Sequence, residues 1–212
     1  ISSLFIENNA TNRGSAVDHF KEDSLMVSNC TFVRNVVSGN GGVITNSGGD
    51  STFTLITNSV FFENELFMGN MFDFSREEEQ GIIAYSFIDK PECPSNIECG
   101  EGMIFEETSP FHNYFRGDLY PHDTSPLINA GKNEYLLPMP DTDLAGQPRI
   151  YGSIVDIGAY ESDIENLTST EETTQQSFKV FPNPSFNGNI NLQIPNGSYQ
   201  VVVNDLQGRH LF

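Results

Sequence analysis

A phenylalanine followed three residues later by an asparagine recurs along the first part of this chain at nearly constant spacing. The strings are FIEN from Phe5, FVRN from Phe32 and FFEN from Phe61, which lie 27 and 29 residues apart, and a degenerate fourth copy begins 26 residues further on at Phe87. Other positions recur in register before and after each Phe: Val27, Ile56 and Ile82; Asn29 and Asn58; Asn8, Asn35 and Asn64; Gly14, Gly41 and Gly69; Val17, Ile44 and Phe72. Each copy is therefore one supersecondary unit.

A unit of this length is too short to bury a core of its own, and it contains no stretch of helical period between its strand-like pieces. We expect each unit to be a coil of three short strands and three turns. Each strand pairs in parallel with its equivalent about 4.8 Å away. Equivalent side chains then stack as a structural ladder of phenylalanines and asparagines (Phe5, Phe32, Phe61 and Phe87; Asn8, Asn35 and Asn64). The repeated glycine would provide a corner with positive φ.

The pattern predicts an all-β fold, a right-handed parallel β-helix with a C-terminal cap, the handedness following the usual crossover preference. The strings FVRN and GGVI resemble the repeats of bacterial right-handed β-helix proteins of the pectate-lyase-like superfamily, and also those of polymorphic outer-membrane adhesins. The resemblance covers about residues 1–92, which we assign to the coils. It implies a fold and little about activity, because this scaffold carries many functions.

The net charge of the chain limits the classes of partner that it can be expected to bind. The 212 residues carry 29 acidic and 10 basic side chains, a formal net charge of −19. A nucleic acid is not expected as a partner, since few cations are available to build a positive face. No apolar run is long enough for a membrane-spanning segment. The opening ISSLFIENN lacks Met, a basic region and an apolar core, so we expect the chain to be part of a longer protein with an incomplete set of N-terminal coils.

Residues 93–161 lose the repeat and are assigned to terminal coils and a cap that closes the open end of the stack. The strings SPLINAG, DTDLAGQPRI and VDIGAYE resemble the C-terminal portion of secreted β-helix proteins of Bacteroidota called choice-of-anchor Q proteins. Five charged residues invite a Ca²⁺ or catalytic interpretation, but we expect Arg149 to pair with one acid and the aspartates to lie at turns (Asp141, Asp143, Arg149, Asp156 and Glu161).

Three cysteines are present. Cys93 and Cys99 are a candidate disulfide in an oxidising compartment, with a metal pair as the weaker alternative. Cys30 is expected to be a buried thiol.

Residues 162–177 are polar and acidic and read as a linker. Residues 178–212 contain FPNPSFNG, GSYQVVV and DLQGRHL, which resemble the C-terminal sorting domain of the type IX secretion system of Bacteroidota. The resemblance implies a small β-sandwich recognised by the type IX machinery, and export across the outer membrane to the medium or cell surface. The module is incomplete here, a partial β-sandwich.

One outward column lies two residues after each repeat Phe and gives weak catalytic candidates: Glu7, Arg34, Glu63 and Asp89. The column resembles the sites of β-helical polysaccharide lyases in the kinds of residue it contains. In those enzymes carboxylates hold Ca²⁺ and an Arg or Lys abstracts a proton. Glu63 and Asp89 are the weak Ca²⁺ candidates, because a cation would relieve their repulsion. The more favoured alternative is a surface ladder of ion pairs. No other cofactor is expected.

Exposed aromatics could stack on sugar rings, although such residues more often fill gaps under a cap (Tyr114, Phe115 and Tyr120). Polar groups in loops are weaker candidates (Asp18 and His19; Arg76, Glu77, Glu78 and Glu79; His112 and His122).

Three hypotheses for the function follow. The first is a secreted or surface β-helix protein that binds or displays toward extracellular carbohydrate. The second is a polysaccharide lyase or glycoside hydrolase with its site mainly in further N-terminal coils, and the third is a structural adhesin or stalk. Whether the chain is an enzyme stays open.

Overall fold

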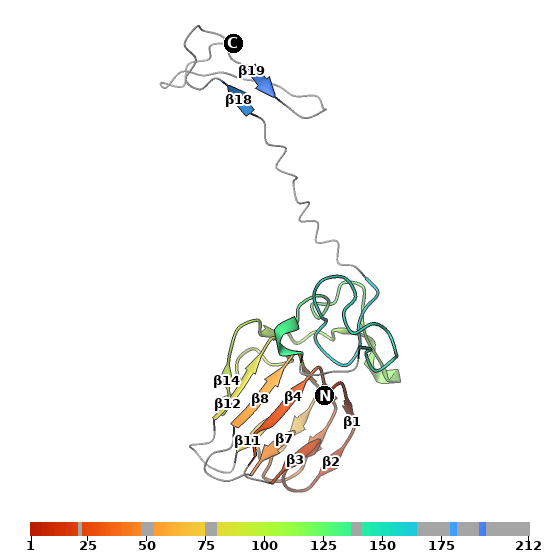
Figure 1. The fold of residues 1–212 in the computed structure, drawn as a ribbon. Coiled ribbons are helices and arrows are strands. Elements are labelled where there is room, and N and C mark those ends of the chain that lie inside the picture. The colour runs from red at the N-terminus through yellow and green to blue at the C-terminus, as the bar shows by residue number, and fades with distance from the viewer. Residues whose placement is uncertain are drawn as a thin grey trace. The chain divides into compact units, whose positions relative to one another are not determined.

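The computed structural model describes residues 1–20, 23–47, 53–74, 80–136, 141–164, 179–181 and 191–193. The chain divides into two units, Ile1–Asn166 and Leu167–Phe212. It is all-β, and the first unit is built mainly from parallel sheets (Figure 1). None of its described helices is long or apolar enough to cross a membrane.

The described residues up to 105 contain four parallel sheets, and successive copies of the repeat contribute adjacent strands to each. Sheet A contains β1 (Leu4–Ile6), β5 (Thr31–Val33), β9 (Val60–Phe62), β13 (Phe87–Ile88) and β15 (Ile104–Phe105). Sheet B contains β2 (Asn9–Ala10), β6 (Val36–Val37) and β10 (Glu65–Leu66), and sheet C contains β3 (Val17–His19), β7 (Ile44–Asn46) and β11 (Phe72–Phe74). Sheet D contains β4 (Leu25–Ser28), β8 (Phe53–Thr57), β12 (Gln80–Ala84) and β14 (Glu98–Cys99).

Each full repeat thus carries four strands, and the expectation of three strands was wrong by one. The missed strands are those of sheet B, which are two residues long. A pair of residues is too short to show an alternating pattern in the sequence. Each of these short strands begins directly after the repeated asparagine of its copy (Asn8, Asn35 or Asn64). The asparagine therefore lies at a corner between sheets A and B.

The core between the sheets is a set of stacked like residues. The rings of Phe5 and Phe32 are 4.7 Å apart, those of Phe32 and Phe61 are 4.6 Å apart, and both pairs are within 3° of parallel. Phe72 from sheet C meets the ring of Phe61 edge-on at 5.0 Å. Val27 and Ile56 from sheet D complete the buried cluster around this column. The ladder of phenylalanines therefore holds over the first three copies.

The fourth copy is shifted by one residue from the sequence alignment. Ile88, not Phe87, pairs with Phe61, and Phe87 pairs with Val60. In sheet D, Ile83 rather than Ile82 pairs with Ile56. Because neighbouring residues of a strand point to opposite faces, the shift turns Phe87 away from the core and places Ile88 and Ile83 inside it. The assignments of Phe87 and Ile82 to the internal columns were wrong.

The repeated glycines are required by close packing more than by backbone angle. Only Gly41 of the three has positive φ, at 146°. A Cβ on Gly69 would lie 1.8 Å from the carbonyl oxygen of Gly41, and one on Gly14 would lie 1.8 Å from the carbonyl oxygen of Val17. The left-handed corners are instead formed by other residues, among them Asn29, Asn58 and Tyr85 at the corner between sheets D and A.

Cys93 and Cys99 form a disulfide in the loop that leads into the last strands of the stack. Both cysteines, with Ile97 and Met103, pack on the core cluster that contains Ile83 and Ile88. This loop covers core residues in the final coil. Cys30 is a free, buried thiol, and burial raises its pKa.

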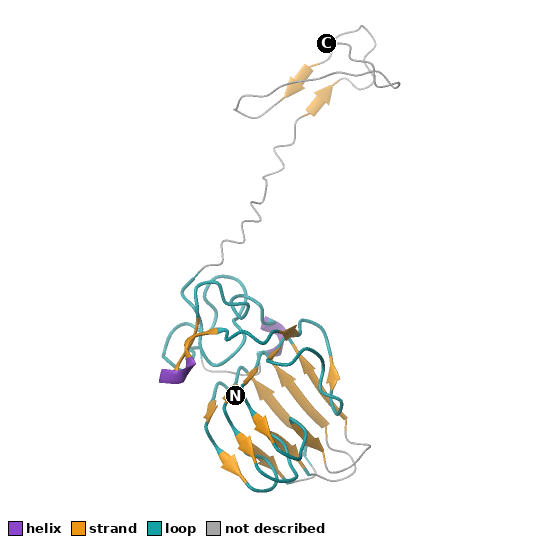
Figure 2. Ribbon diagram, turned by 180° about the vertical axis from the view of Figure 1, so that it is seen from behind, coloured by secondary structure: helices purple, strands orange, loops and turns teal. Residues whose placement is uncertain are grey.

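Residues 111–136 and 141–160 pack along the outer face of sheet A, whereas the sequence predicted a cap over the end of the stack. The segment contains β16 (Phe111–Asn113), η1 (Tyr114–Arg116), β17 (Asp118–Pro121) and η2 (Asn133–Tyr135). Its Phe111, Leu127 and Ile157 bury Val33 and Phe62. Figure 2 shows this part, with both short helices, beside the strands. We call residues 111–136 and 141–160 the covering segment.

Asparagines at the corner between sheets D and A hold the covering segment in place. Nδ2 of Asn29 donates to the carbonyl of Asp156 at 3.2 Å, and Nδ2 of Asn58 donates to the carbonyl of Lys132 at 3.1 Å. Oδ1 of Asn58 accepts the backbone N–H of Lys132 at 2.8 Å.

In the second unit the described strands β18 (Lys179–Phe181) and β19 (Asn191–Gln193) form an antiparallel pair. The strings GSYQVVV and DLQGRHL lie outside the described residues, as does most of the expected linker. The described part of the first unit runs on to Ile164, and Ser162 is buried with its N–H donated to Asp156 at 2.7 Å. Ser162, the first residue of the expected linker, thus packs with the first unit.

Candidate functional site

The corner between sheets A and B carries the charged column expected from the repeat. Glu7, Arg34 and Glu63 occupy it with φ values of 52°, 52° and 50°. Such a left-handed conformation is uncommon for residues other than glycine and asparagine. The next residue of each copy is the ladder asparagine, so each corner has the form of a left-handed charged residue followed by Asn.

Hydrogen bonds between asparagines fix this corner. Oδ1 of Asn35 accepts both the backbone N–H and Nδ2 of Asn8, at 3.1 and 2.8 Å. Oδ1 of Asn64 accepts the same two groups of Asn35, at 3.0 and 2.9 Å. The ladder satisfies the buried amides and leaves the preceding charged side chain to project outward.

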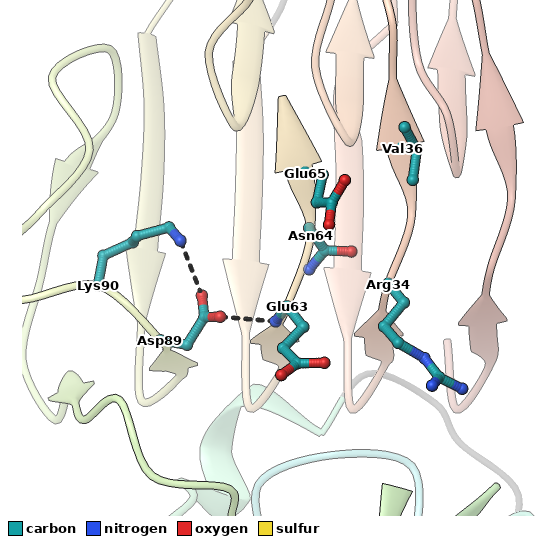
Figure 3. Close-up of a pocket in the computed structure, with 7 residues that line it drawn as sticks. All are labelled: Arg34, Val36, Glu63, Asn64, Glu65, Asp89 and Lys90. Carbon is teal, nitrogen blue, oxygen red and sulfur yellow. Dashed lines mark hydrogen bonds and ion pairs between the residues drawn. The ribbon is translucent and has the colours of Figure 1, made fainter. Parts of the chain in front are cut away.

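The fourth member of the column is Lys90, because Ile88 is the register partner of Phe61 and Lys90 lies two residues after it. The sequence prediction placed Asp89 at this position, because it aligned the fourth copy on Phe87 and was therefore wrong by one residue. The Lys90 side chain reaches toward Asp89 and does not continue the row of Arg34 and Glu63 (Figure 3). Asp89 lies one position earlier and is nearly buried.

Asp89 takes part in the corner through its carboxylate. Its Oδ2 accepts the backbone N–H of Glu63 at 2.6 Å, and its Oδ1 lies 3.6 Å from Nζ of Lys90 (Figure 3). Burial raises the pKa of this carboxyl group, and the bond from the Glu63 amide opposes that shift. Arg34 forms an ion pair with Glu7.

A pocket of about 410 Å³ lies over this corner. Figure 3 shows its lining residues, and Arg34 and Glu63 project toward the same side. The lining comprises Arg34, Val36, Glu63, Asn64, Glu65, Asp89 and Lys90. Sequence analysis found Arg34, Glu63 and Asp89 and missed Glu65 and Lys90. No repeated pattern marks Glu65, because the equivalent positions in the earlier copies are Asn9 and Val36, and only the pairing in sheet A identifies Lys90.

Two aromatic residues of the covering segment contact charged side chains that line the pocket. The hydroxyl of Tyr114 donates to Oε1 of Glu63 at 2.7 Å. The guanidinium carbon of Arg34 lies 5.9 Å from the Tyr114 ring centroid and 6.0 Å from that of Phe115. Phe115 is 70% exposed. Tyr120 instead stacks on Tyr160 with ring centroids 4.3 Å apart, so it belongs to the packing of the covering segment.

The two Ca²⁺ candidates are not joined by a third acidic or histidine ligand. Across the described ranges, no group of three or more His, Cys, Asp or Glu is arranged to hold a metal ion. Glu63 and Asp89 each have the hydrogen bonds given above. Among the described residues, Oδ1 of Asp89 accepts no hydrogen bond and has only the ion-pair contact with Lys90.

The acidic residues near the C-terminal end of the first unit form a structural cluster. Arg149 and Glu161 form an ion pair in which both side chains are almost fully buried. Both carboxylate oxygens of Asp143 and of Asp156 accept backbone N–H groups, from Ala145, Gln147 and Glu161 and from Asn129 and Ser162. Burial, with the neighbouring Asp156, raises the pKa of Glu161 to about 7. Asp141 is exposed.

The remaining loop candidates lie elsewhere. Asp18 pairs with Arg13 at 3.6 Å, and the His19 ring nitrogen Nδ1 is 2.9 Å from Oδ1 of Asn46. His112 lies near Asp118 and Asp123 on the exposed hairpin of β16 and β17, and His122 is bonded within its own turn. Arg76, Glu77, Glu78 and Glu79 lie outside the described residues.

Comparison with known proteins gives no relative: no protein-family model, no curated protein and no solved structure matches this chain.

Proposed function

We propose that residues 1–105 form a right-handed parallel β-helix. The chain visits sheets A, B, C and D in the same order in each of the first copies, and every pairing between copies is parallel. Stacking of like residues in the Phe and Asn columns supports a helical coil. The right hand follows from the general preference of parallel crossovers.

We propose further that the protein is secreted or held at the outer cell surface, as a choice-of-anchor Q type β-helix protein of Bacteroidota exported by the type IX system. The disulfide between Cys93 and Cys99 supports an oxidising location. The strings FPNPSFNG, GSYQVVV and DLQGRHL support recognition by the type IX machinery.

Export can be tested in a Bacteroidota host that has this secretion system. Replacing residues 181–188 by a Gly-Ser sequence in the otherwise intact protein should abolish its recovery from the surface and medium and cause accumulation in the periplasm. The same replacement at residues 166–173 serves as the control and should leave export unchanged. Normal export of the first variant would contradict the assignment.

At the surface, the protein binds extracellular carbohydrate at the corner between sheets A and B. The observation that carries this proposal is the pocket of about 410 Å³ lined by charged donors and acceptors, with the exposed ring of Phe115 beside the lining residue Arg34. Sugar sites commonly combine a few well-placed polar groups with an aromatic surface. The proposal assigns no reaction to the chain.

Binding can be measured by titration calorimetry with a panel of oligosaccharides. Phe115→Ala should weaken binding about fivefold through loss of the ring surface, which corresponds to about 1 kcal/mol. Phe20→Ala is a matched control, because Phe20 is 66% exposed and also lies under an arginine, Arg13. Equal affinities of the Phe115 and Phe20 variants would place the ligand elsewhere.

The same panel decides the enzyme question. Release of unsaturated uronate, seen as a rise in ultraviolet absorbance, would identify a lyase, and release of reducing ends would identify a hydrolase. If either activity occurs, Arg34→Ala tests whether the corner is responsible. Unchanged activity of that variant would exclude the charged column as the catalytic site.

A further inference from the structure

We infer that the pocket over the corner between sheets A and B takes an uncharged, hydroxyl-rich sugar and discriminates against uronates. This inference rests on the proposed carbohydrate binding and specifies its ligand class. It follows from the charges around the pocket, from the pairing of its cations and from the donors and acceptors it offers.

Acidic groups outnumber basic ones in the lining. Glu63, Glu65 and Asp89 contribute three carboxylates, and Arg34 and Lys90 contribute two cations. Glu7 adds a fourth carboxylate through its ion pair with Arg34. An anionic ligand would therefore enter a region of negative potential, in a chain whose formal net charge is −19.

Both cations of the lining already have a carboxylate beside them. Arg34 pairs with Glu7, and Nζ of Lys90 lies 3.6 Å from Oδ1 of Asp89. A uronate would have to share a cation that already has a carboxylate partner, and drawing the cation away would leave that carboxylate without its counter-charge. The cost would be largest at Asp89, whose side chain is only 8% exposed.

Neutral hydroxyl groups avoid this cost. Each hydroxyl donates one hydrogen bond and accepts others, so it can donate to a carboxylate while accepting from a neighbouring cation. Acidic and basic groups are interleaved at this corner, since Arg34 lies between Glu7 and Glu63 along the stack and Lys90 lies beside Asp89. Adjacent hydroxyls on a sugar ring can thus meet an acceptor and a donor in turn.

The apolar parts of the site fit the same ligand. Phe115 presents an exposed ring beside Arg34, and Val36 contributes to the lining. A pyranose has a face of C–H groups that can lie on an aromatic ring while its hydroxyls point to the charged column. The amide of Asn64 is committed to the ladder and leaves recognition to the charged side chains.

The test compares neutral oligosaccharides of gluco, manno, galacto and xylo configuration with oligogalacturonate of the same length, using the full chain and titration calorimetry. We expect at least one neutral sugar to bind at least tenfold more tightly than the uronate. Raising the salt concentration should change the neutral affinity little, since no net charge is neutralised on binding.

A charge variant gives an independent readout. Glu65→Gln removes one lining carboxylate that makes no ladder contact, and it should raise uronate affinity about threefold through reduced repulsion. Glu107→Gln, at an exposed position outside the pocket, is the matched control and should have no effect.

The outcomes separate the two proposals. Uronate binding as tight as that of every neutral sugar, weakened by Arg34→Ala, would overturn the inference and leave carbohydrate binding intact. Failure of the whole panel to bind would overturn both.

Discussion

Asn35 donates its backbone N–H and its side-chain amide to one oxygen, Oδ1 of Asn64, at 3.0 and 2.9 Å. The same side chain accepts two bonds from Asn8 and donates to the carbonyl of Phe5. One buried amide thus connects three successive copies of the repeat, directly beneath the charged corner. The ladder fixes the corner's backbone and hence the position of Arg34 and Glu63.

Asn35→Ala should therefore lower the free energy of unfolding by about 2 to 4 kcal/mol, because buried donors and acceptors on both sides lose their partner. Asn8→Ala, at the exposed end of the ladder, should cost less than about 1 kcal/mol. Chemical denaturation of the two variants measures the difference. Equal losses would show that the ladder is not a cooperative structural element.

The shift of the fourth copy gives a second prediction. Phe87 faces the covering segment and Ile88 faces the core. Phe87→Ala should loosen the covering segment and speed hydrogen exchange at the amides of Ile157 and Gly158, which bond to Leu127 and Asn58.

Ile88→Ala is the matched variant on the opposite face. It should speed exchange at core amides such as that of Val43, which donates to the carbonyl of Met71 at 2.8 Å. If Phe87→Ala instead speeds exchange at the core amides and Ile88→Ala speeds it in the covering segment, then Phe87, not Ile88, continues the phenylalanine column.

The sequence was sufficient for the first three copies because stacking repeats the same chemistry at each level. Phe5, Phe32 and Phe61 are each followed by the ladder asparagine, which fixes the register. The fourth copy lacks that asparagine, and Phe87 and Ile88 are both apolar, so periodicity alone cannot distinguish them. The one-residue shift of the fourth copy also affects the candidate site, because it places Lys90 instead of Asp89 at the fourth position of the charged column.

The covering segment could not be placed from the sequence. Its contacts join residues far apart in the chain, as between Asn29 and Asp156 or between Tyr114 and Glu63. No repeat or period marks these partners. For that reason the sequence identified the aromatic side chains without indicating that two of them meet Arg34.

The buried pair of Arg149 and Glu161 gives a pH prediction. The folded pKa of Glu161, about 7, lies above its ordinary value of 4.5. Between these values the folded state binds more protons than the unfolded state, so stability should fall as the pH rises from about 4.5 through 7. Asp156, whose pKa is also raised by burial, acts in the same direction.

Glu161→Gln should flatten this pH dependence, which for Glu161 has an upper bound of about 3 kcal/mol. The Glu107→Gln variant should retain the full slope. Urea unfolding between pH 4.5 and 8 provides the measurement. A stability that rises over this range in the wild-type chain would show that the ion pair with Arg149 outweighs the effect of burial.

The final prediction concerns the disulfide of the last coil. Opening the short loop between Cys93 and Cys99 by the double change Cys93→Ala and Cys99→Ala should lower stability by about 2 kcal/mol, chiefly through the greater entropy of the unfolded chain. A separate check is thiol titration, because Cys30 is buried and should react only on unfolding.

The oxidised native protein should then show no reactive thiol, and mild reduction should expose the two thiols of Cys93 and Cys99. Fast reaction of one thiol before reduction would mean that Cys30 is accessible or that the disulfide is absent, and titration of a Cys30→Ala variant distinguishes these cases. Absence of the disulfide would remove the main structural support for an oxidising, extracellular location.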